Sequence, residues 1–172
     1  RFFNTGVYER HEVNFTHSPA MDIQVASNFE RYLYYALDQN GERVKAFMQR
    51  FLETGKAELP FNTSSFDEAV VAGAVSNEDT LMTIQETYSE YGYIADPHTA
   101  VGLHVASKNL DPEVPMVCLS TAHPAKFDDV MKTALPDVVV SHPTLDVLRD
   151  LPTRKQSLDV DINAIKKLIE TV

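Results

Sequence analysis

Residues 117–127, which read V-C-L-S-T-A-H-P-A-K-F, are the stretch that most constrains the fold of the chain. It continues an apolar run from Met116 and breaks after Leu119 into small and polar residues. Such a run predicts a buried strand leading into a loop, because Pro124 prevents further strand pairing. In open α/β sheets, ligands bind beyond the carboxyl ends of strands. The stretch is therefore a candidate binding site, although Ser and Thr are also ordinary turn residues.

The composition is that of an ordinary globular protein and limits the classes of partner. The 172 residues are 44% hydrophobic and 23% charged, and no apolar run is long enough to span a bilayer. A net charge of −10 argues against nucleic acid and against anionic membranes as partners. It does not exclude a small anionic substrate, because a local Arg or Lys cluster can override the global sign.

Cysteine usage indicates a reducing compartment. Cys118 is the single cysteine, so a disulfide framework is impossible and the cytoplasm is the expected location. Its position within an apolar run favours a buried packing residue over a nucleophile.

Apolar residues at helical spacing, together with capping residues, predict a series of helices. Ser27 with Glu30 forms a capping box, Ser76 with Asp79 forms a variant of it, and Asp96 is an N-cap followed by a proline. Glycines mark several helix ends. The predicted helices cover residues 28–40, 42–54, 77–91, 97–106, 127–134, 145–151 and 161–172.

Short apolar runs between the helices predict strands. The small residues of 69–75 are typical of a segment whose backbone packs tightly. Alternation of such runs with helices predicts an α/β fold, a layered sheet with flanking helices and some parallel pairing. With no repeat and no long linker, we expect one region over residues 1–172. The expected strands or extended segments lie at 8–13, 66–75, 116–119 and 138–140.

Few residues carry an obvious chemical signature. The dinucleotide-binding, P-loop and nucleophile-elbow glycine motifs are absent, and the 6 histidines show no metal-ligand spacing, so no metal site is predicted. Ser120, Thr121, His123 and Lys126 could form a cluster of hydroxyls and bases. We favour a hydroxyl that hydrogen-bonds a cofactor ring nitrogen, with Lys126 near a charged group, over a Ser–His nucleophile pair.

Three stretches together resemble threonine synthase, a pyridoxal-phosphate-dependent family of fold type II, the tryptophan synthase β-like class. They read S-P-A-M-D-I-Q-V-A-S-N-F-E-R at 18–31, G-Y-I-A-D-P-H-T-A-V-G at 92–102 and L-S-T-A-H-P-A-K-F at 119–127. Their order and spacing match the family over essentially the whole chain. The resemblance implies conversion of O-phospho-L-homoserine and water to L-threonine and phosphate, with pyridoxal phosphate as the electron sink.

The resemblance also implies roles for individual residues. Thr121 best matches the hydroxyl that faces the pyridine nitrogen of the cofactor, with Ser120 second; a neutral hydroxyl leaves that nitrogen less protonated than a carboxylate would. Asp96 matches an acidic residue near the ring, and it can also be a helix N-cap. Asn28 and Arg31 match a segment near the substrate, where Arg31 is either a phosphate contact or part of a surface ion pair.

The chain departs from the family at the covalent residue. The Schiff-base lysine of threonine synthases lies upstream in an S-F-K-D-like motif, which does not occur here, and Lys126 does not match it. R-F-F-N-T-G at 1–6 resembles the segment that follows the phosphate-cradling loop. We therefore expect a carboxyl-terminal part of the enzyme that needs the amino-terminal part as its partner. By itself it should be inactive and form no Schiff base.

Two other interpretations stay open from the sequence. The chain could be an interaction or regulatory module that keeps the fold without the chemistry. It could also belong to another fold type II enzyme, such as a threonine deaminase-like lyase, but A-H-P-A-K-F at 122–127 argues against that.

Overall fold

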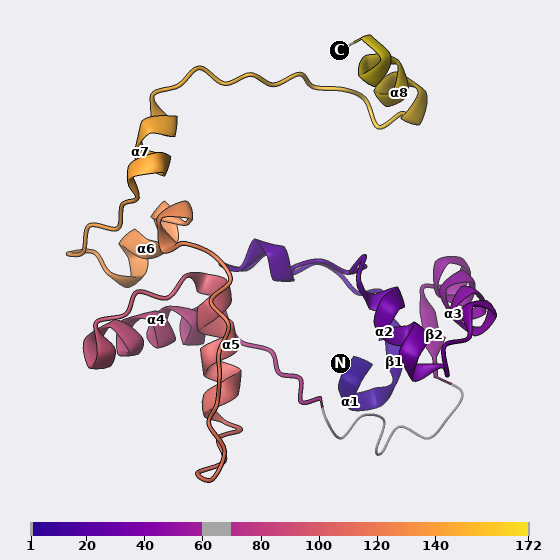
Figure 1. Cartoon of the computed structure of the whole chain (residues 1–172), viewed down its shortest axis with the longest axis horizontal. Coiled ribbons are helices and arrows are strands. Elements are labelled where there is room, and N and C mark those ends of the chain that lie inside the picture. The colour runs from indigo at the N-terminus through magenta and orange to yellow at the C-terminus, as the bar shows by residue number, and fades with distance from the viewer. Residues whose placement is uncertain (1, 60–69, 172) are drawn as a thin grey trace. The chain divides into compact units, whose positions relative to one another are not determined.

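The computed structural model describes residues 2–59 and 70–171, which form two compact units, 1–140 and 141–172 (Figure 1). The regular elements of the described residues are helices and one small sheet, and the predicted α/β class is confirmed. The elements of the first unit are α1 (Phe2–Thr5), β1 (Val7–Glu9), η1 (Pro19–Met21), α2 (Phe29–Ala36), α3 (Gly41–Thr54), β2 (Lys56–Glu58), α4 (Asn77–Tyr91), α5 (Pro97–Ser107), η2 (Pro124–Lys126) and α6 (Asp128–Ala134). Those of the second are α7 (Pro143–Arg149) and α8 (Ile162–Thr171).

The first hydrophobic core joins α1, α2 and α3 to the β1–β2 pair. Leu33 and Phe51, from the apolar faces of α2 and α3, are fully buried. The Tyr8 ring of β1 lies 4.3 Å from the Phe29 ring and 4.4 Å from the Phe51 ring, measured between centroids. Burial of each large apolar side chain contributes about 1.5–3 kcal/mol, so this aromatic cluster holds the amino-terminal elements together.

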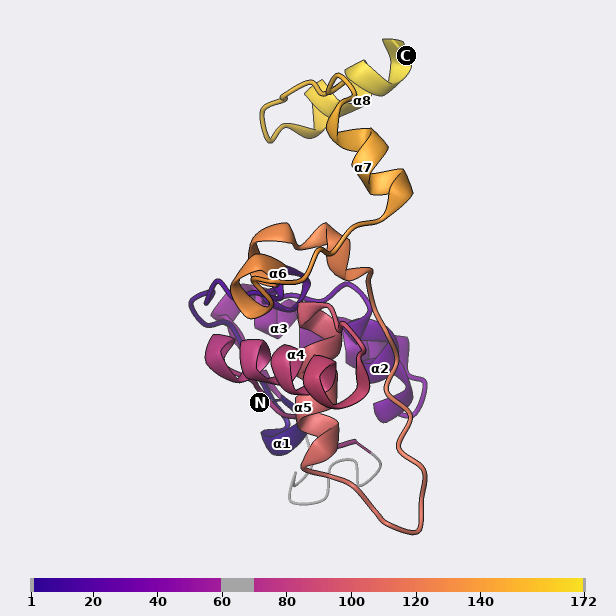
Figure 2. The same ribbon diagram turned by 90° about the vertical axis from the view of Figure 1, so that its left-hand side faces the viewer.

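The second core lies among α4, α5 and α6, which are seen together in Figure 2. Ile84 of α4, Ala100 of α5 and Met131 of α6 are almost completely buried there. Small residues such as Ala95 and Ala100 allow the amino-terminal end of α5 to lie close to its neighbours. This packing fixes the end of α5 that carries the candidate site.

Several helix boundaries follow the predicted capping chemistry. The Ser76 hydroxyl oxygen accepts a hydrogen bond from the Asp79 backbone N–H at 3.0 Å, and α4 ends at Gly92 with a φ of 67°, a left-handed conformation that favours glycine. The capping box predicted for Ser27 is wrong. Helix α2 begins one residue later than predicted, after Asn28, whose side chain makes no capping bond.

The strand predictions are mostly wrong. The described residues contain one sheet, in which β1 and β2 pair antiparallel with Tyr8 opposite Ala57. Residues 116–119 and 138–140 form no strand. In the strand predicted for residues 66–75, residues 70–75 form none, and residues 66–69 lie outside the described part of the chain. A strand requires a neighbour for its backbone hydrogen bonds, and the described residues provide none for these runs.

The apolar run before the candidate loop is exposed rather than buried. Val117 and Leu119 keep 78% and 80% of their surface accessible. Cys118 is also exposed, so its expected role as a buried packing residue is wrong. The segment predicted to pack tightly makes one close approach, at Gly73, where a Cβ would lie 2.9 Å from Cγ2 of Val105, but Val71, Gly73 and Ala74 are exposed.

The second unit consists of α7 and α8. Helix α7 begins two residues before the predicted position because His142 caps it, its Nδ1 accepting the Thr144 backbone N–H at 3.3 Å. Helix α8 confirms the predicted amphipathic helix, but Ile162 and Ile169 are 66% and 70% exposed. No helix among the described residues has the length and apolar character needed to cross a membrane.

Candidate functional site

A buried carboxylate lies at the amino-terminal end of α5. Asp96 is 1% exposed and caps the helix, its Oδ1 accepting the His98 backbone N–H at 3.0 Å. Pro97 follows at the first helical position, where its missing N–H is not needed. The D-P-H-T sequence thus both starts the helix and encloses an acidic group.

The His98 ring connects this carboxylate to a segment far away in the sequence. Its Nε2 accepts the Ala20 backbone N–H at 3.2 Å, and its Nδ1 lies 3.1 Å from Oδ1 of Asp96. Because the amide can only donate, Nε2 is unprotonated, so Nδ1 carries the proton and donates it to the carboxylate. The Ser18 hydroxyl adds a hydrogen bond to the Pro97 carbonyl at 3.0 Å.

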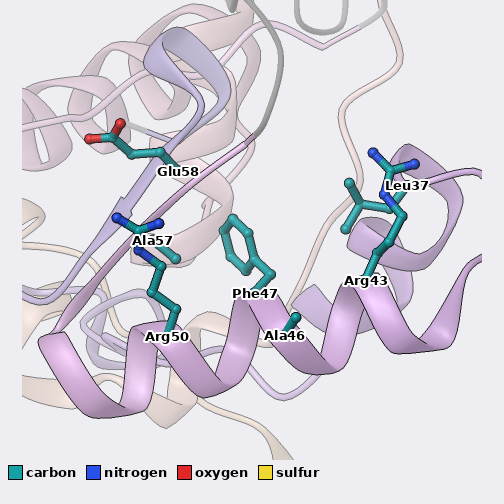
Figure 3. Close-up of a pocket in the computed structure, with 7 residues that line it drawn as sticks. All are labelled: Leu37, Arg43, Ala46, Phe47, Arg50, Ala57 and Glu58. Atoms are coloured by element: carbon teal, nitrogen blue, oxygen red, sulfur yellow. The ribbon is translucent and has the colours of Figure 1, made fainter.

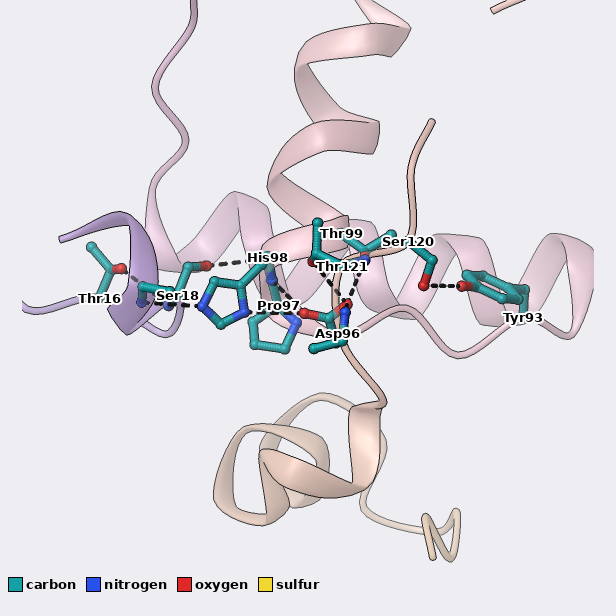
Figure 4. Close-up of polar contacts among 11 residues, drawn as sticks. Thr16, Ser18, Tyr93, Asp96, Pro97, His98, Thr99, Ser120 and Thr121 are labelled. Carbon is teal, nitrogen blue, oxygen red and sulfur yellow. Dashed lines mark hydrogen bonds and ion pairs between the residues drawn. The ribbon is translucent and has the colours of Figure 1, made fainter. Parts of the chain in front are cut away.

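A third segment reaches the same carboxylate through Thr99. The Thr99 hydroxyl donates to Oδ2 of Asp96, and its oxygen accepts the Thr121 backbone N–H at 3.0 Å. The Ala122 backbone N–H donates to Oδ2 at 3.3 Å. Figure 4 shows His98, Thr99 and Thr121 around Asp96. We call the set formed by Ser18, Ala20 and residues 96–99 and 121–122 the Asp96 network.

Electrostatics keep the central group ionised. Burial by itself would raise the pKa of Asp96. Hydrogen bonds from the Thr99 hydroxyl and from the backbone and ring of His98 outweigh burial and hold the pKa of that carboxyl below its ordinary value. Asp96 is therefore a carboxylate whose negative charge is stabilised by hydrogen-bond donors.

Two exposed hydroxyls border the network. The Thr121 side chain places Oγ1 3.3 Å from Oγ1 of Thr99 and 3.4 Å from Oδ2 of Asp96. The neighbouring Ser120 Oγ accepts a hydrogen bond from the Tyr93 hydroxyl at 3.2 Å. Ser120 and Thr121 are both exposed. They can therefore hydrogen-bond to a ligand while Tyr93 and Thr99 hold them in place.

The structure brings together only part of the predicted site. Thr121 and Asp96 share the network, and Ser120 adjoins it. Asn28 and Arg31 lie at the start of α2 with exposed side chains, and Lys126 is exposed at the end of η2. None of these three contributes a hydrogen bond to the Asp96 network.

Sequence reasoning missed Tyr93, His98 and Thr99. Thr99 had a detectable signal, because it lies three residues after the N-cap Asp96. Ser76 and Asp79 have the same spacing, except that there the N-cap is the hydroxyl residue and the third position is the carboxylate. The contacts of His98 with Ala20 and of Tyr93 with Ser120 had no comparable local signal, since these partners lie 78 and 27 residues away in the sequence.

A separate hollow of about 250 Å³ lies between α3 and β2 (Figure 3). Buried side chains of the first core, such as Phe47 and Ala57, form part of its wall. Its charged groups include Arg43, which pairs with Asp38 at 2.8 Å, and Glu58, which pairs with Lys56 at 2.8 Å. The hollow shares no residue with the Asp96 network, which remains the better candidate site.

Comparison with known proteins identifies relatives over nearly the whole chain. The family model "Threonine synthase, C-terminal" matches residues 99–169. Threonine synthase from Methylobacillus glycogenes is 34% identical over an alignment that covers 98% of this chain and 37% of that protein.

Two solved structures agree with the sequence relatives. A pyridoxal-phosphate-bound threonine synthase from Brucella melitensis superposes with a TM-score of 0.79 at 36% identity, covering 99% of this chain and 36% of that one. Threonine synthase from yeast gives a TM-score of 0.82 at 34% identity, covering 99% and 39%.

The Asp96 carboxylate should make the stability of the chain depend on pH. Its pKa is lower in the folded than in the unfolded chain, so its contribution is complete above the unfolded value of about 3.9 and is lost as pH falls through the folded value. Urea unfolding between about pH 3 and pH 7 measures this loss. Asp96→Asn should show a smaller loss on acidification than the parent chain, whereas the exposed control Asp137→Asn should follow the parent. An unchanged pH dependence in Asp96→Asn would contradict the assignment.

Proposed function

This chain belongs to the threonine synthase family, and we propose that residues 1–172 form the carboxyl-terminal part of an enzyme that converts O-phospho-L-homoserine and water to L-threonine and phosphate. The chain spans 36% to 39% of the length of the relatives described above, so the activity is proposed for the larger protein. The observation that carries the proposal is the convergence of three segments on Asp96, directly behind the exposed hydroxyl of Thr121.

The residues of the network fit the ring side of pyridoxal phosphate. When bound, the cofactor supplies an electron sink for the reaction. Thr121 is an exposed residue whose hydroxyl can hydrogen-bond a ring nitrogen, with the Ser120 hydroxyl beside it. The network contains hydroxyls, a neutral imidazole and a carboxylate, and none of these groups is a cation for a phosphate. We therefore assign the cofactor phosphate and the covalent lysine to the amino-terminal part.

The remaining predicted residues are proposed to contact the substrate. Arg31 is exposed on α2, and its guanidinium can bind a phosphate through two parallel hydrogen bonds. Asn28 precedes it at the same helix end and has both a donor and an acceptor in its amide. Lys126 offers a third exposed polar group and would attract the anionic substrate.

The partner proposed for this chain is the amino-terminal part of the same enzyme. A groove of about 470 Å³ runs between α5 and the apolar residues 116–119. Val117 and Leu119 are largely exposed at this groove, and their backbone groups lack a neighbouring strand among the described residues. Because this chain covers only 37% of the length of the Methylobacillus glycogenes relative, we propose that the remaining chain covers the groove.

The first test of this function is reconstitution. Phosphate release from O-phospho-L-homoserine should require the chain, the amino-terminal part and pyridoxal phosphate together. Thr121→Val should lower kcat roughly 10- to 100-fold, because a hydrogen bond to a charged or polarised group contributes about 1.5–3 kcal/mol. Thr133→Val, on the exposed side of α6, is the matched control and should keep the parent rate.

A folded complex of the two parts that releases no phosphate would contradict the catalytic proposal. That outcome would favour an interaction or regulatory module with the same fold.

The docking surface can be tested through Cys118, the only thiol in the chain. Ellman's reagent should react with Cys118 in the free chain as fast as in the urea-unfolded chain. Adding the amino-terminal part should slow the reaction at least about tenfold, which corresponds to about 1.4 kcal/mol of protection. A reaction rate that stays unchanged in the assembled complex would show that the groove is not the covered surface.

A further inference from the structure

We propose that Asp96 and Thr99 are positioning residues that fix the Thr121 hydroxyl as a hydrogen-bond acceptor toward the cofactor ring nitrogen, and that this arrangement favours the protonated form of that nitrogen. The proposal rests on the proposed function, because it takes Thr121 as the partner of the ring nitrogen. It adds that the ring nitrogen is the donor and the Thr121 hydroxyl the acceptor in that hydrogen bond, and that Asp96 and Thr99 orient the hydroxyl.

The direction follows from counting protons in the network. Thr99 has a single hydroxyl hydrogen, which it donates to Oδ2 of Asp96. Asp96 is ionised and has no hydrogen to donate. Both groups within reach of the Thr121 oxygen, at 3.3 and 3.4 Å, are therefore acceptors toward it. The Thr121 hydroxyl must direct its own hydrogen inward to satisfy either contact.

The Thr121 side chain is also held by its backbone. Its N–H donates to the Thr99 oxygen at 3.0 Å, and the next residue, Ala122, donates its N–H to Asp96 at 3.3 Å. The two hydroxyl contacts are long for O–H···O bonds, so the backbone bonds set the position and the carboxylate sets the orientation. A hydrogen bond to a buried charge is about twice as strong as one between neutral groups, which favours inward donation.

An inward hydrogen leaves the lone pairs of the Thr121 oxygen facing out toward the ligand. A ring nitrogen that carries a proton donates to these lone pairs, whereas an unprotonated nitrogen would meet them as a second acceptor. The proton comes from water, and Asp96 stays ionised. The sequence led to the expectation that a neutral hydroxyl leaves this nitrogen less protonated than a carboxylate would, and the proposal differs from it because a carboxylate lies behind the hydroxyl.

The experiment measures the ring nitrogen directly. The holoenzyme containing this chain and its amino-terminal part is loaded with pyridoxal phosphate labelled with ¹⁵N in the ring, and the ¹⁵N chemical shift is recorded. The parent protein should give the shift of a protonated pyridine. Thr99→Val and Asp96→Asn should lower the ratio of protonated to unprotonated nitrogen about tenfold or more, equivalent to a change of one pKa unit. Thr99→Ser keeps the hydroxyl and should give the parent shift.

The same series separates this inference from the proposed function. If Thr121→Val changes the shift but Thr99→Val and Asp96→Asn do not, the positioning role is overturned and Thr121 remains the partner of the nitrogen. If Thr121→Val leaves the shift unchanged, both are overturned. An unprotonated nitrogen in the parent protein also overturns the inference. Should Asp96→Asn fail to fold, the comparison of Thr99→Val with Thr99→Ser decides the question.

Discussion

The hydrogen bonding of the Asp96 carboxylate is the interaction on which the candidate site depends. An ionised group that is 1% exposed is costly unless donors surround it. Here the direct donors come from two segments, His98 and Thr99 beside Asp96 in the sequence and Ala122 farther along the chain. A third segment is attached indirectly, because the Ala20 N–H donates to the other nitrogen of the His98 ring. Satisfying one charge therefore brings residues that are distant in sequence into a fixed arrangement. The three segments are also those that carry the resemblance to threonine synthase, which gives a physical reason for their occurring together.

Only one of the two hydrophobic cores supports the Asp96 network. The second core, around Ile84 and Met131, fixes the end of α5 on which Asp96 lies. The first core, around Phe51, stabilises the amino-terminal elements but supplies no side chain to the network. The site is thus built by hydrogen bonds at the margin of a small core, with its hydroxyls open to a ligand. A partner that covers the exposed residues 116–119 would complete the surroundings of the site.

Local chemistry in the sequence located the helices, although it failed for the Ser27 cap of α2, but it did not locate most of the strands. The Ser76 cap, the Gly92 stop and the Asp96–Pro97 start are each determined by residues a few positions apart, and the structure contains all three. Residues 116–119 have the composition of a buried strand, yet burial and pairing depend on chain segments that the described residues do not provide. For the site, the motifs indicated Thr121 and Asp96, whereas the role of His98 depends on a contact across 78 residues that no local pattern encodes.

One carboxylate holds three segments of the chain together, and amide hydrogen exchange tests this most directly. Exchange at the backbone N–H groups of Ala20, Thr121 and Ala122 should be compared between the parent chain and Asp96→Ala. All three amides should lose protection in the variant, while amides in the middle of α3 keep theirs, because the first core does not depend on the carboxylate. Parent-like protection of Ala20 in a folded Asp96→Ala chain would contradict this role of Asp96.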